Sequence, residues 1–567
     1  MSPEYSIDGD YFRSGEIEGS IASAFMQGGG FDGDQLGKAP IIGICNSWSE
    51  LNPCNASLDK VAQSVSEGII AAGGVPVEFP TISIHEQINN PSSLMLRNLM
   101  AMDVEEMITK SPIDGVVLLN GCDKTVPAQL MGAISGGKPM ISISAGPRSV
   151  STCGGKISTI HNLWGKKEER QKGEVSDEEW KEFTSKIIPD RGTCNVMGTA
   201  STMSGIVEAL GFSLPGTAFL PAASEARLRA AEQTGRMAVE MTTEGRTPDT
   251  VVNDESLENA FRAVCALGGS SNAVIHLEAI AGRLGSRLGL DSFREWSSTT
   301  PHLVSVIPSG VHQLDEFSEA GGMPLVFKRL ASSMNLDSRL VTGESWKDVI
   351  EKVSDTDSTV VRPKDNPVSD QGGLAILQGS LAPDGAVFKR SAVPKEFWTV
   401  NGPAVVFDGL ADMENRINDP DLDVSGDSIL VLRGMGPVGG PGMPEAAKIP
   451  IPKKLWDQGV RNMLRISDGR MSGTADGAVV LHVTPEAAVG GPLAFVRDGD
   501  IIDFDAEAGS LELQVDQAEL EQRDQQFVKT RKPSRGYEWL YSNHVTQADR
   551  GADLDFLVHE SLKSKLD

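Results

Sequence analysis

Residues 40–79 read PIIGICNSWSELNPCNASLDKVAQSVSEGIIAAGGVPVEF and alternate between apolar runs and one amphipathic segment. The run 40–45 predicts a buried strand, 58–74 a helix that ends at glycines, and 75–79 a second strand. A strand, a helix and a strand in this order are typical of a parallel sheet that carries helices on both faces. This stretch therefore predicts an α/β fold.

The same alternation continues downstream of this stretch. A helical pattern at 94–108 leads to a strand-like run at 114–121, and a short helical pattern at 127–134 leads to another run at 139–146. In parallel sheets, ligands bind in the loops that follow the carboxyl ends of the strands. We therefore expect the functional residues of this region to stand just after its strands.

The middle of the chain is helical in pattern. Residues 166–191 are rich in charge and predict a helical excursion on the surface, and helical patterns then dominate from about 201 to 335.

The last third of the chain has a different character. From about residue 370, short strand-like runs alternate with Gly, Pro and Asp turns, which indicates a β-barrel or sandwich. The polar stretch 353–372 separates the two regions. A chain of 567 residues is also too long for one hydrophobic core, since single cores stop growing at roughly 250–300 residues. We predict an N-terminal α/β domain over 1–365 and a C-terminal barrel-like domain over 366–567.

Composition narrows the range of partners. The formal net charge of −27 repels phosphate backbones and anionic lipid headgroups, so nucleic acid and membrane surfaces are poor partners. An anionic substrate would need local positive charge from a metal, Lys or Arg. The N-terminal MSPEYSIDGD lacks the features of a secretory signal, and no apolar run approaches the roughly 20 residues of a membrane span. We expect a soluble, cytoplasmic protein.

Three of the six cysteines stand in loops beyond strand-like runs. Cys54 precedes a helix, where a thiolate is favoured, and Cys194 lies in a loop of small residues. Cys122 adjoins Asp123 and Lys124, a group of reactive side chains that packing explains poorly. A cysteine is most often a small buried hydrophobe, and these three are too far apart in sequence for a local zinc or ferredoxin motif. Their spacing allows one metal site only if the loops converge.

A serine loop near the C-terminus is a further candidate. GMPE at 442–445 is followed by RISDGRMSGTADG at 465–477, in which Ser472 stands on a Gly-rich turn. Such a serine is a nucleophile, a base or a helix N-cap, and taken alone the cap is favoured. The G-x-S-x-G motif of hydrolases is absent from this sequence segment, which argues against acyl transfer.

Taken together, these segments resemble the dihydroxyacid and sugar-acid dehydratase family over nearly the full length of the chain. The matching signatures are PCN (53–55), GCDKT-x-PA (121–128), GTCN-x-MGTASTM (192–203), EALG-x-SLPG (208–216), GGS-x-NAV-x-HL (268–277), PDGAV (383–387), GPVGGPGMPE (436–445), SDGRMSGTA (467–475) and PEAAVGGPLA (485–494). The resemblance implies a hydro-lyase that assembles as a homodimer or homotetramer.

The variant signatures favour a sugar-acid substrate. GCDKTVPA replaces the GCDKNMPG of the branched-chain enzymes, and the segment 535–557 is similar to the C-terminal signature of arabinonate and xylonate dehydratases. The alternatives are a branched-chain dihydroxyacid dehydratase and a non-catalytic iron–sulfur protein, which would need only the cysteines. Ser57 stands where the family commonly has histidine, and GADLDFL (551–557) replaces GCDFDFL.

The resemblance also implies roles for individual residues. The implied ligands of a [2Fe–2S] cluster, with [4Fe–4S] as the alternative, are Cys54, Cys122 and Cys194. The implied magnesium ligands are Glu86, Asp123, carbamylated Lys124 and Glu445. Ser472 would be the general base. The implied reaction converts a 2,3-dihydroxy carboxylate to a 2-keto-3-deoxy acid.

Overall fold

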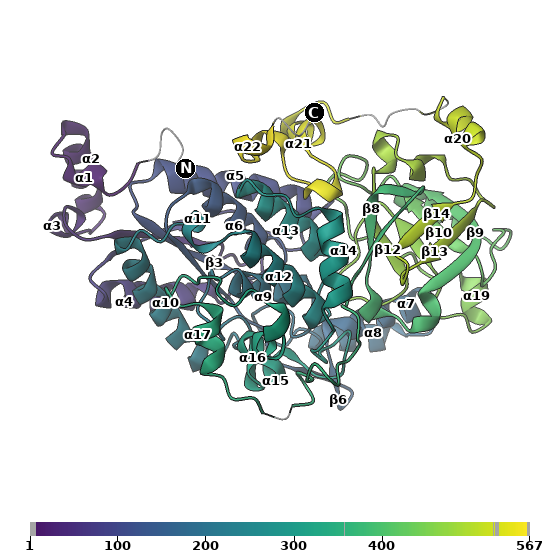
Figure 1. Cartoon of the computed structure of the whole chain (residues 1–567), viewed down its shortest axis with the longest axis horizontal. Coiled ribbons are helices and arrows are strands. Elements are labelled where there is room, and N and C mark those ends of the chain that lie inside the picture. Colours follow the sequence, from purple (N-terminus) through teal and green to yellow (C-terminus); the bar gives the residue numbers. More distant parts are fainter. Residues whose placement is uncertain (1–6, 357, 526, 528–531, 564–567) are drawn as a thin grey trace.

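The computed structural model describes residues 7–356, 358–525, 527 and 532–563. Its N-terminal half is built on a parallel sheet of strand order β2-β1-β3-β4 (Figure 1). The strands are β1 (Ile41–Asn46), β2 (Val75–Pro80), β3 (Gly115–Asn120) and β4 (Met140–Ser144). β1, β3 and β4 are buried along their whole length, as expected for a parallel sheet covered on both faces.

The order of the strands decides where loops converge. The chain runs from β1 outward to β2 through α4 (Leu58–Ala71), then crosses back through α5 (Ser93–Lys110) to β3 and continues through α6 (Thr125–Gly136) to β4. Because parallel crossovers are right-handed, this reversal places α4 on one face and α5 and α6 on the other. Helix α4 packs on α10 (Glu225–Thr243), and α5 packs on α6. The reversal opens a crevice at the carboxyl ends of β1 and β3.

Further helices complete the N-terminal core. Three of them are buried over most of their length: α9 (Thr199–Ala209), α12 (Asp254–Leu267) and α13 (Asn272–Arg283). The others around this core are α14 (Gly289–Thr299), α15 (Leu314–Glu319), α16 (Gly322–Arg329) and α17 (Trp346–Glu351). Together with the sheet they enclose one continuous apolar core.

The C-terminal half contains a closed β-barrel of strand order β10-β11-β12-β8-β7-β14-β13-β9. The strands are β7 (Ala375–Gly379), β8 (Ala382–Phe388), β9 (Thr399–Asp408), β10 (Ile429–Arg433), β11 (Arg465–Ser467), β12 (Val479–Thr484), β13 (Ile501–Asp505) and β14 (Ser510–Leu513). β9 to β12 are parallel neighbours, so the loops that follow β10 and β11 emerge at the same end. The predicted combination of an α/β region and a barrel is confirmed.

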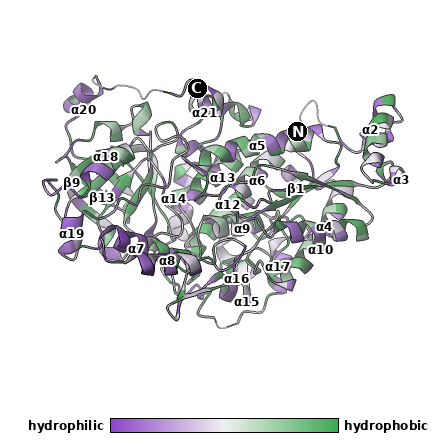
Figure 2. Cartoon of the chain, turned by 180° about the vertical axis from the view of Figure 1, so that it is seen from behind, coloured by the Kyte–Doolittle hydropathy of each residue, from purple (hydrophilic) through white to green (hydrophobic). Residues whose placement is uncertain are grey.

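The charge-rich segment predicted as a surface excursion forms α7 (Ile160–Gln171) and α8 (Asp177–Lys186), which are largely hydrophilic (Figure 2). Helix α7 nevertheless packs on the barrel. Trp164 Nε1 donates to Thr474 Oγ1 at 2.7 Å, and Lys172 donates to the carbonyl of Ile451. The segment is therefore helical, as predicted, but it also forms part of the contact between the two halves.

The C-terminus returns to the first half of the chain, where α21 (Gly536–His544) lies beside α5 (Figure 1). Tyr537 donates to the carbonyl of Met95 at 2.7 Å, and the buried Arg97 donates to the carbonyl of Gly551 at 2.9 Å. The division into domains at 365/366 stays a prediction. Within the described ranges, no helix has both the length and the apolar character needed to cross a membrane.

Candidate active site

Sulfur ligands gather at the crevice between β1 and β3. Cys54 lies in the loop after β1 and Cys122 directly after β3. Their Sγ atoms and a ring nitrogen of His85 all lie within 4.8 Å of one another. His85 follows β2, and the sequence analysis did not select it.

Cys194 approaches this group from the loop that precedes α9. Arg148, in the loop after β4, places Nη2 at 3.6 Å from Cys54 Sγ and 3.9 Å from Cys194 Sγ. Its Nε also donates to the carbonyl of Thr193 at 3.0 Å. One guanidinium therefore joins two of the three predicted cysteines, and Cys194 lies on the Arg148 side of the group.

The pKa values of the three cysteines are shifted in different directions. A hydrogen bond from Cys122 and the nearby His85 and Arg148 lower the pKa of Cys54, whereas the same bond and burial raise the pKa of Cys122. Burial raises the pKa of Cys194 to about 12. A bound metal ion stabilises thiolates outright, so the three sulfurs fit an iron–sulfur group.

An oxygen-rich group lies next to the sulfurs. Carboxylate oxygens of Glu86, Asp123 and Glu445 lie within 4.8 Å of one another, although these residues come from three separate loops. Their side chains are 11%, 18% and 8% exposed, so each carboxylate is largely shielded from solvent. Oxygen ligands of this kind suit hard cations such as Mg²⁺.

Two cationic side chains hold these carboxylates. Lys124 Nζ lies 3.0 Å from Glu86 and 3.9 Å from Asp123, yet it meets hydrogen-bond geometry with none of the described acceptors. The contact is therefore an ion pair without a directed bond. Arg470 Nη1 lies 3.0 Å from Glu445, and its Nη2 lies 3.3 Å from Glu86.

Lys124 and Arg470 do not have equal effects on the pKa values of the three carboxylates. Burial opposes ionisation of Glu86, but Lys124 and Arg470 overcome it and lower its pKa to about 2. Burial and the charge of Glu86 raise the pKa of Glu445 to about 7, and burial raises the pKa of Asp123. A divalent cation among these oxygens would remove the mutual repulsion, so the group fits magnesium.

The sulfur and oxygen groups are joined by adjacent residues. His85 and Glu86 are neighbours in sequence, as are Cys122 and Asp123. In each pair the first residue belongs to the sulfur group and the second to the oxygen group. The two groups therefore form one continuous centre.

Ser472 lies in a turn between β11 and β12, so the interpretation as a helix N-cap is wrong. Its Oγ lies 2.9 Å from Thr474 Oγ1 and accepts from the backbone N–H of Thr474 at 3.4 Å. The indole N–H of Trp164 donates to Thr474 Oγ1, and this hydroxyl can still donate to or accept from Ser472. Facing a deprotonated serine it can only donate, and with the backbone N–H of Thr474 it would then supply two donors. Neither Thr474 nor Trp164 was among the residues predicted from the sequence.

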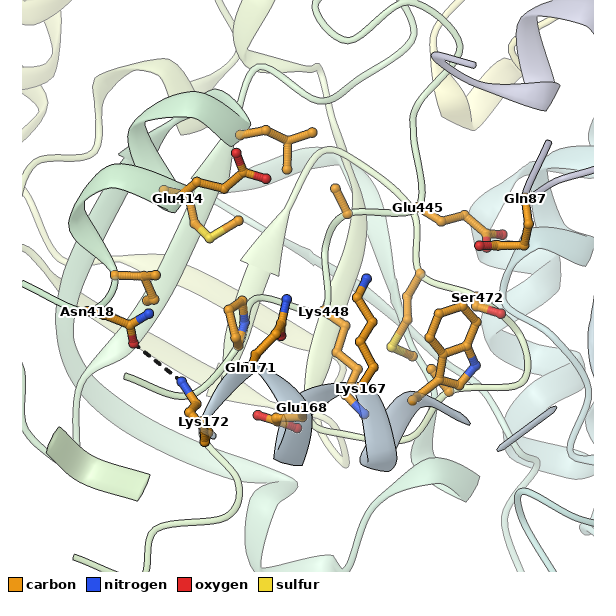
Figure 3. A pocket seen from close by; sticks show the side chains of 18 residues that line it. Gln87, Lys167, Glu168, Gln171, Lys172, Glu414, Asn418, Glu445, Lys448 and Ser472 are labelled. Atoms are coloured by element: carbon orange, nitrogen blue, oxygen red, sulfur yellow. Dashed lines mark hydrogen bonds between the residues drawn. The ribbon is translucent and has the colours of Figure 1, made fainter. Parts of the chain in front are cut away.

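Ser472 and Glu445 line a cavity of about 550 Å³ between α7 and the barrel (Figure 3). Lys167 and Gln171 extend from α7 into it. Lys172 also lines the cavity, but its ammonium is engaged by Asn418 and the Ile451 carbonyl. The wall is therefore mixed, with polar side chains of α7 facing apolar residues such as Leu410 and Met413.

Asn272 connects the loops that bring Glu445 and Ser472 to the cavity. Its Nδ2 donates to Glu445 at 3.1 Å and to the carbonyl of Met471 at 3.4 Å. Ser57, which stands where the resembled family commonly has histidine, is half-buried, and its shielded Oγ has no hydrogen-bond partner among the described residues.

Comparison with known proteins identifies the family. Residues 39–349 match the family model for the dihydroxy-acid/6-phosphogluconate dehydratase N-terminal region, and residues 359–552 match the model for the C-terminal region. The chain is 46% identical to a dehydratase of Rhizobium meliloti (strain 1021), over 96% of this chain and 95% of that one. It is 45% identical to the L-arabonate dehydratase of Azospirillum brasilense, over 97% and 96% of the two chains.

A third relative is the 6-deoxy-6-sulfo-D-gluconate dehydratase of Pseudomonas putida, which is 44% identical over 92% of this chain and 91% of its own length. Both halves of the structure and the centre between them thus lie within the matched regions. The chain belongs to the dihydroxy-acid/6-phosphogluconate dehydratase family of hydro-lyases.

Proposed function

We propose that this protein dehydrates a sugar acid, an aldonate with hydroxyl groups at C2 and C3, to a 2-keto-3-deoxy acid. The observation that carries this proposal is the set of polar side chains that α7 places in the cavity beside Ser472. Lys167 and Gln171 reach into it, and no carboxylate of the described residues forms an ion pair with Lys167. A hydroxylated chain can form hydrogen bonds with such a wall. The branched apolar chain of a dihydroxyacid from amino-acid synthesis offers these polar groups no hydrogen-bond partner.

The centre would hold two metal groups. Cys54, Cys122 and Cys194 would ligate an iron–sulfur cluster, a [2Fe–2S] cluster by resemblance. Glu86, Asp123, Glu445 and Lys124 as its carbamate would ligate magnesium. Lys124 Nζ is fully buried and forms ion pairs with Glu86 and Asp123 but no directed hydrogen bond, and as a carbamate Lys124 would add a further oxygen ligand to theirs, which supports carbamylation. When bound, the two groups supply Lewis acidity toward the substrate carboxylate and hydroxyls.

The protein's own residues would perform the proton transfer. Ser472, deprotonated, would take the C2 proton and return it to the C3 hydroxyl, which leaves as water, so that the serine is again ready to act as a base. An ordinary serine is too weak a base for this step. The hydroxyl and the backbone N–H of Thr474 stabilise negative charge on the serine oxygen, and Trp164 orients that hydroxyl. The enol formed by elimination then tautomerises to the keto acid.

A substrate panel tests this proposal. Anaerobically purified protein is assayed with pentonates, hexonates and 2,3-dihydroxyisovalerate, and the keto-acid product is detected. We expect at least one aldonate to give the highest kcat/KM. We also expect Lys167→Met to lower that kcat/KM about 10- to 100-fold through KM, since hydrogen bonds with charged groups contribute about 1.5–3 kcal/mol.

Lys166→Met is the matched control for the panel. Lys166 is the adjacent residue on α7, forms an ion pair with Glu169 at 3.3 Å and does not line the cavity. It should keep the wild-type kcat/KM. A preference for 2,3-dihydroxyisovalerate over every aldonate would refute the sugar-acid proposal.

A second prediction concerns the donor to Ser472. Thr474→Val keeps the shape of the side chain but removes the hydroxyl, so kcat should fall about 10- to 100-fold while KM changes little. Loss of a donor to the serine oxygen raises the pKa of Ser472. The pH at which kcat reaches half its maximum should therefore move upward. Thr474→Ser retains the hydroxyl and should restore both values. An unchanged kcat and pH profile in Thr474→Val would show that this contact does not assist the base.

A further inference from the structure

His85 is a component of the centre to which the proposed reaction assigns no task. A ring nitrogen of His85 lies within 4.8 Å of the Sγ atoms of both Cys54 and Cys122. The residue stands in the loop after β2, between the strand and Glu86. A histidine enclosed with two cysteines is either a metal ligand or a hydrogen-bond donor to sulfur.

The backbone around His85 distinguishes these two roles. The N–H of Gln87 donates to His85 Nδ1 at 3.2 Å. The N–H of His85 itself donates to Asn89 Oδ1 at 2.7 Å, which holds the turn in place. Because Nδ1 accepts a hydrogen bond, the proton of the neutral ring resides on Nε2. A protonated ring nitrogen donates and does not ligate a metal.

The arrangement of donors around the sulfurs supports the same role. Arg148 approaches the sulfurs of Cys54 and Cys194, whereas His85 approaches those of Cys54 and Cys122. Each predicted cluster ligand thus has a donor beside it, and Cys54 has both. Hydrogen bonds to the sulfurs are among the main determinants of the reduction potential of an iron–sulfur cluster, since they stabilise the more negative reduced form.

We propose that His85 donates a hydrogen bond from Nε2 to the sulfur of Cys54 in the assembled centre and thereby raises the reduction potential of the cluster. This inference rests on the proposed function, since it requires that the cysteines bind a cluster. It makes His85 a positioning residue that sets the electronic state of the cluster while leaving the ligation to the cysteines.

Redox titration of anaerobically purified protein, followed by EPR, tests this role. His85→Ala should retain the iron, sulfide and visible absorption of the wild type, but its midpoint potential should be more negative. His85→Gln keeps an N–H donor of similar reach and should recover part of the shift. His559→Ala is the matched control, because His559 is exposed near the C-terminus, and it should keep the wild-type potential.

A spectroscopic readout on the wild type needs no variant. With isotopically labelled histidine, pulsed EPR of the reduced cluster should detect a weak nitrogen coupling, as expected for a donor to sulfur. A strong coupling typical of ligated imidazole would overturn the donor role. So would equal potentials in His85→Ala and the wild type. A wild-type protein that is active on aldonates but contains no iron or sulfide would overturn both this inference and the proposed cluster. A protein that contains the cluster and turns over no aldonate would overturn only the proposed function.

Discussion

Replacing Ser472 with alanine is expected to lower turnover of the best aldonate by about 10²- to 10⁴-fold, the usual contribution of a positioned general base. The reason is local. Ser472 borders the cavity, and its oxygen lies within hydrogen-bond distance of the hydroxyl and the backbone N–H of Thr474. Its side chain contacts no predicted metal ligand in the recorded hydrogen bonds of the described residues. Steady-state kinetics and the visible spectrum are measured on the same sample. Loss of the general base lowers kcat and leaves the spectrum unchanged, whereas loss of the metal centre changes both.

The visible absorption, iron content and magnesium content of Ser472→Ala should equal those of the wild type. A variant that loses its colour would show that the serine supports the metal centre instead. Turnover close to that of the wild type would contradict the assignment of Ser472 as the base.

Cys122→Ser is expected to abolish both visible absorption and turnover. Cys122 is 2% exposed, and its Sγ lies in the group with Cys54 and His85. A serine hydroxyl is a poor ligand for a metal that prefers soft thiolates, so the cluster should not be retained. Absorption spectra and iron and sulfide content of the purified variant measure the first effect, and the aldonate assay measures the second.

Cys153→Ser is the control for this experiment. Cys153 lies on the hairpin of β5 (Ser151–Cys153) and β6 (Lys156–Ser158), where its sulfur contacts only the hydroxyl of Ser151 among the recorded hydrogen bonds of the described residues. It should keep full colour and activity. A coloured, active Cys122→Ser would exclude this cysteine as a cluster ligand.

The fold was largely predictable because its signals are local. The apolar runs at 40–45 and 114–121 correspond closely to β1 and β3, since buried parallel strands are apolar along their length. The pairing of strands that lie far apart in the sequence could not be predicted in this way. The parallel alignment of β10 with β11 pairs Leu430 with Arg465 across a long intervening segment that includes α19 (Lys453–Asp457), and no local pattern encodes such a contact. That alignment is nevertheless what brings the loops of Glu445 and Ser472 to one end of the barrel.

The part of the candidate site that could be predicted consists of reactive residues that lie close together in the sequence, within short loops. Cys122, Asp123 and Lys124 are consecutive, so their unusual combination is visible in the sequence. His85 and Arg148 are single residues without periodicity, and only the convergence of loops after β2 and β4 reveals their contact with the sulfurs. Their positions just beyond predicted strands were the sequence feature that could have identified them as site residues.

The same reasoning explains the segment at 166–191. Its charges correctly predicted helices, but most residues of α7 are half-buried because this helix packs on the barrel. Charge alone does not distinguish a helix face exposed to bulk solvent from one that lines a cavity. The side chains of Lys167 and Gln171 lie on the face of α7 that lines the cavity. The acidic chain would therefore meet its anionic substrate with a local lysine and bound metal ions.

In the proposed mechanism, one continuous centre holds an iron–sulfur cluster beside a magnesium ion. Both groups can be measured by quantitation of iron, acid-labile sulfide and magnesium, combined with Mössbauer spectroscopy of anaerobically purified, active protein. We expect the iron and sulfide of one [2Fe–2S] cluster and one magnesium per chain, with a change at one iron when the aldonate is added. Full activity in protein that lacks iron and sulfide would contradict this mechanism.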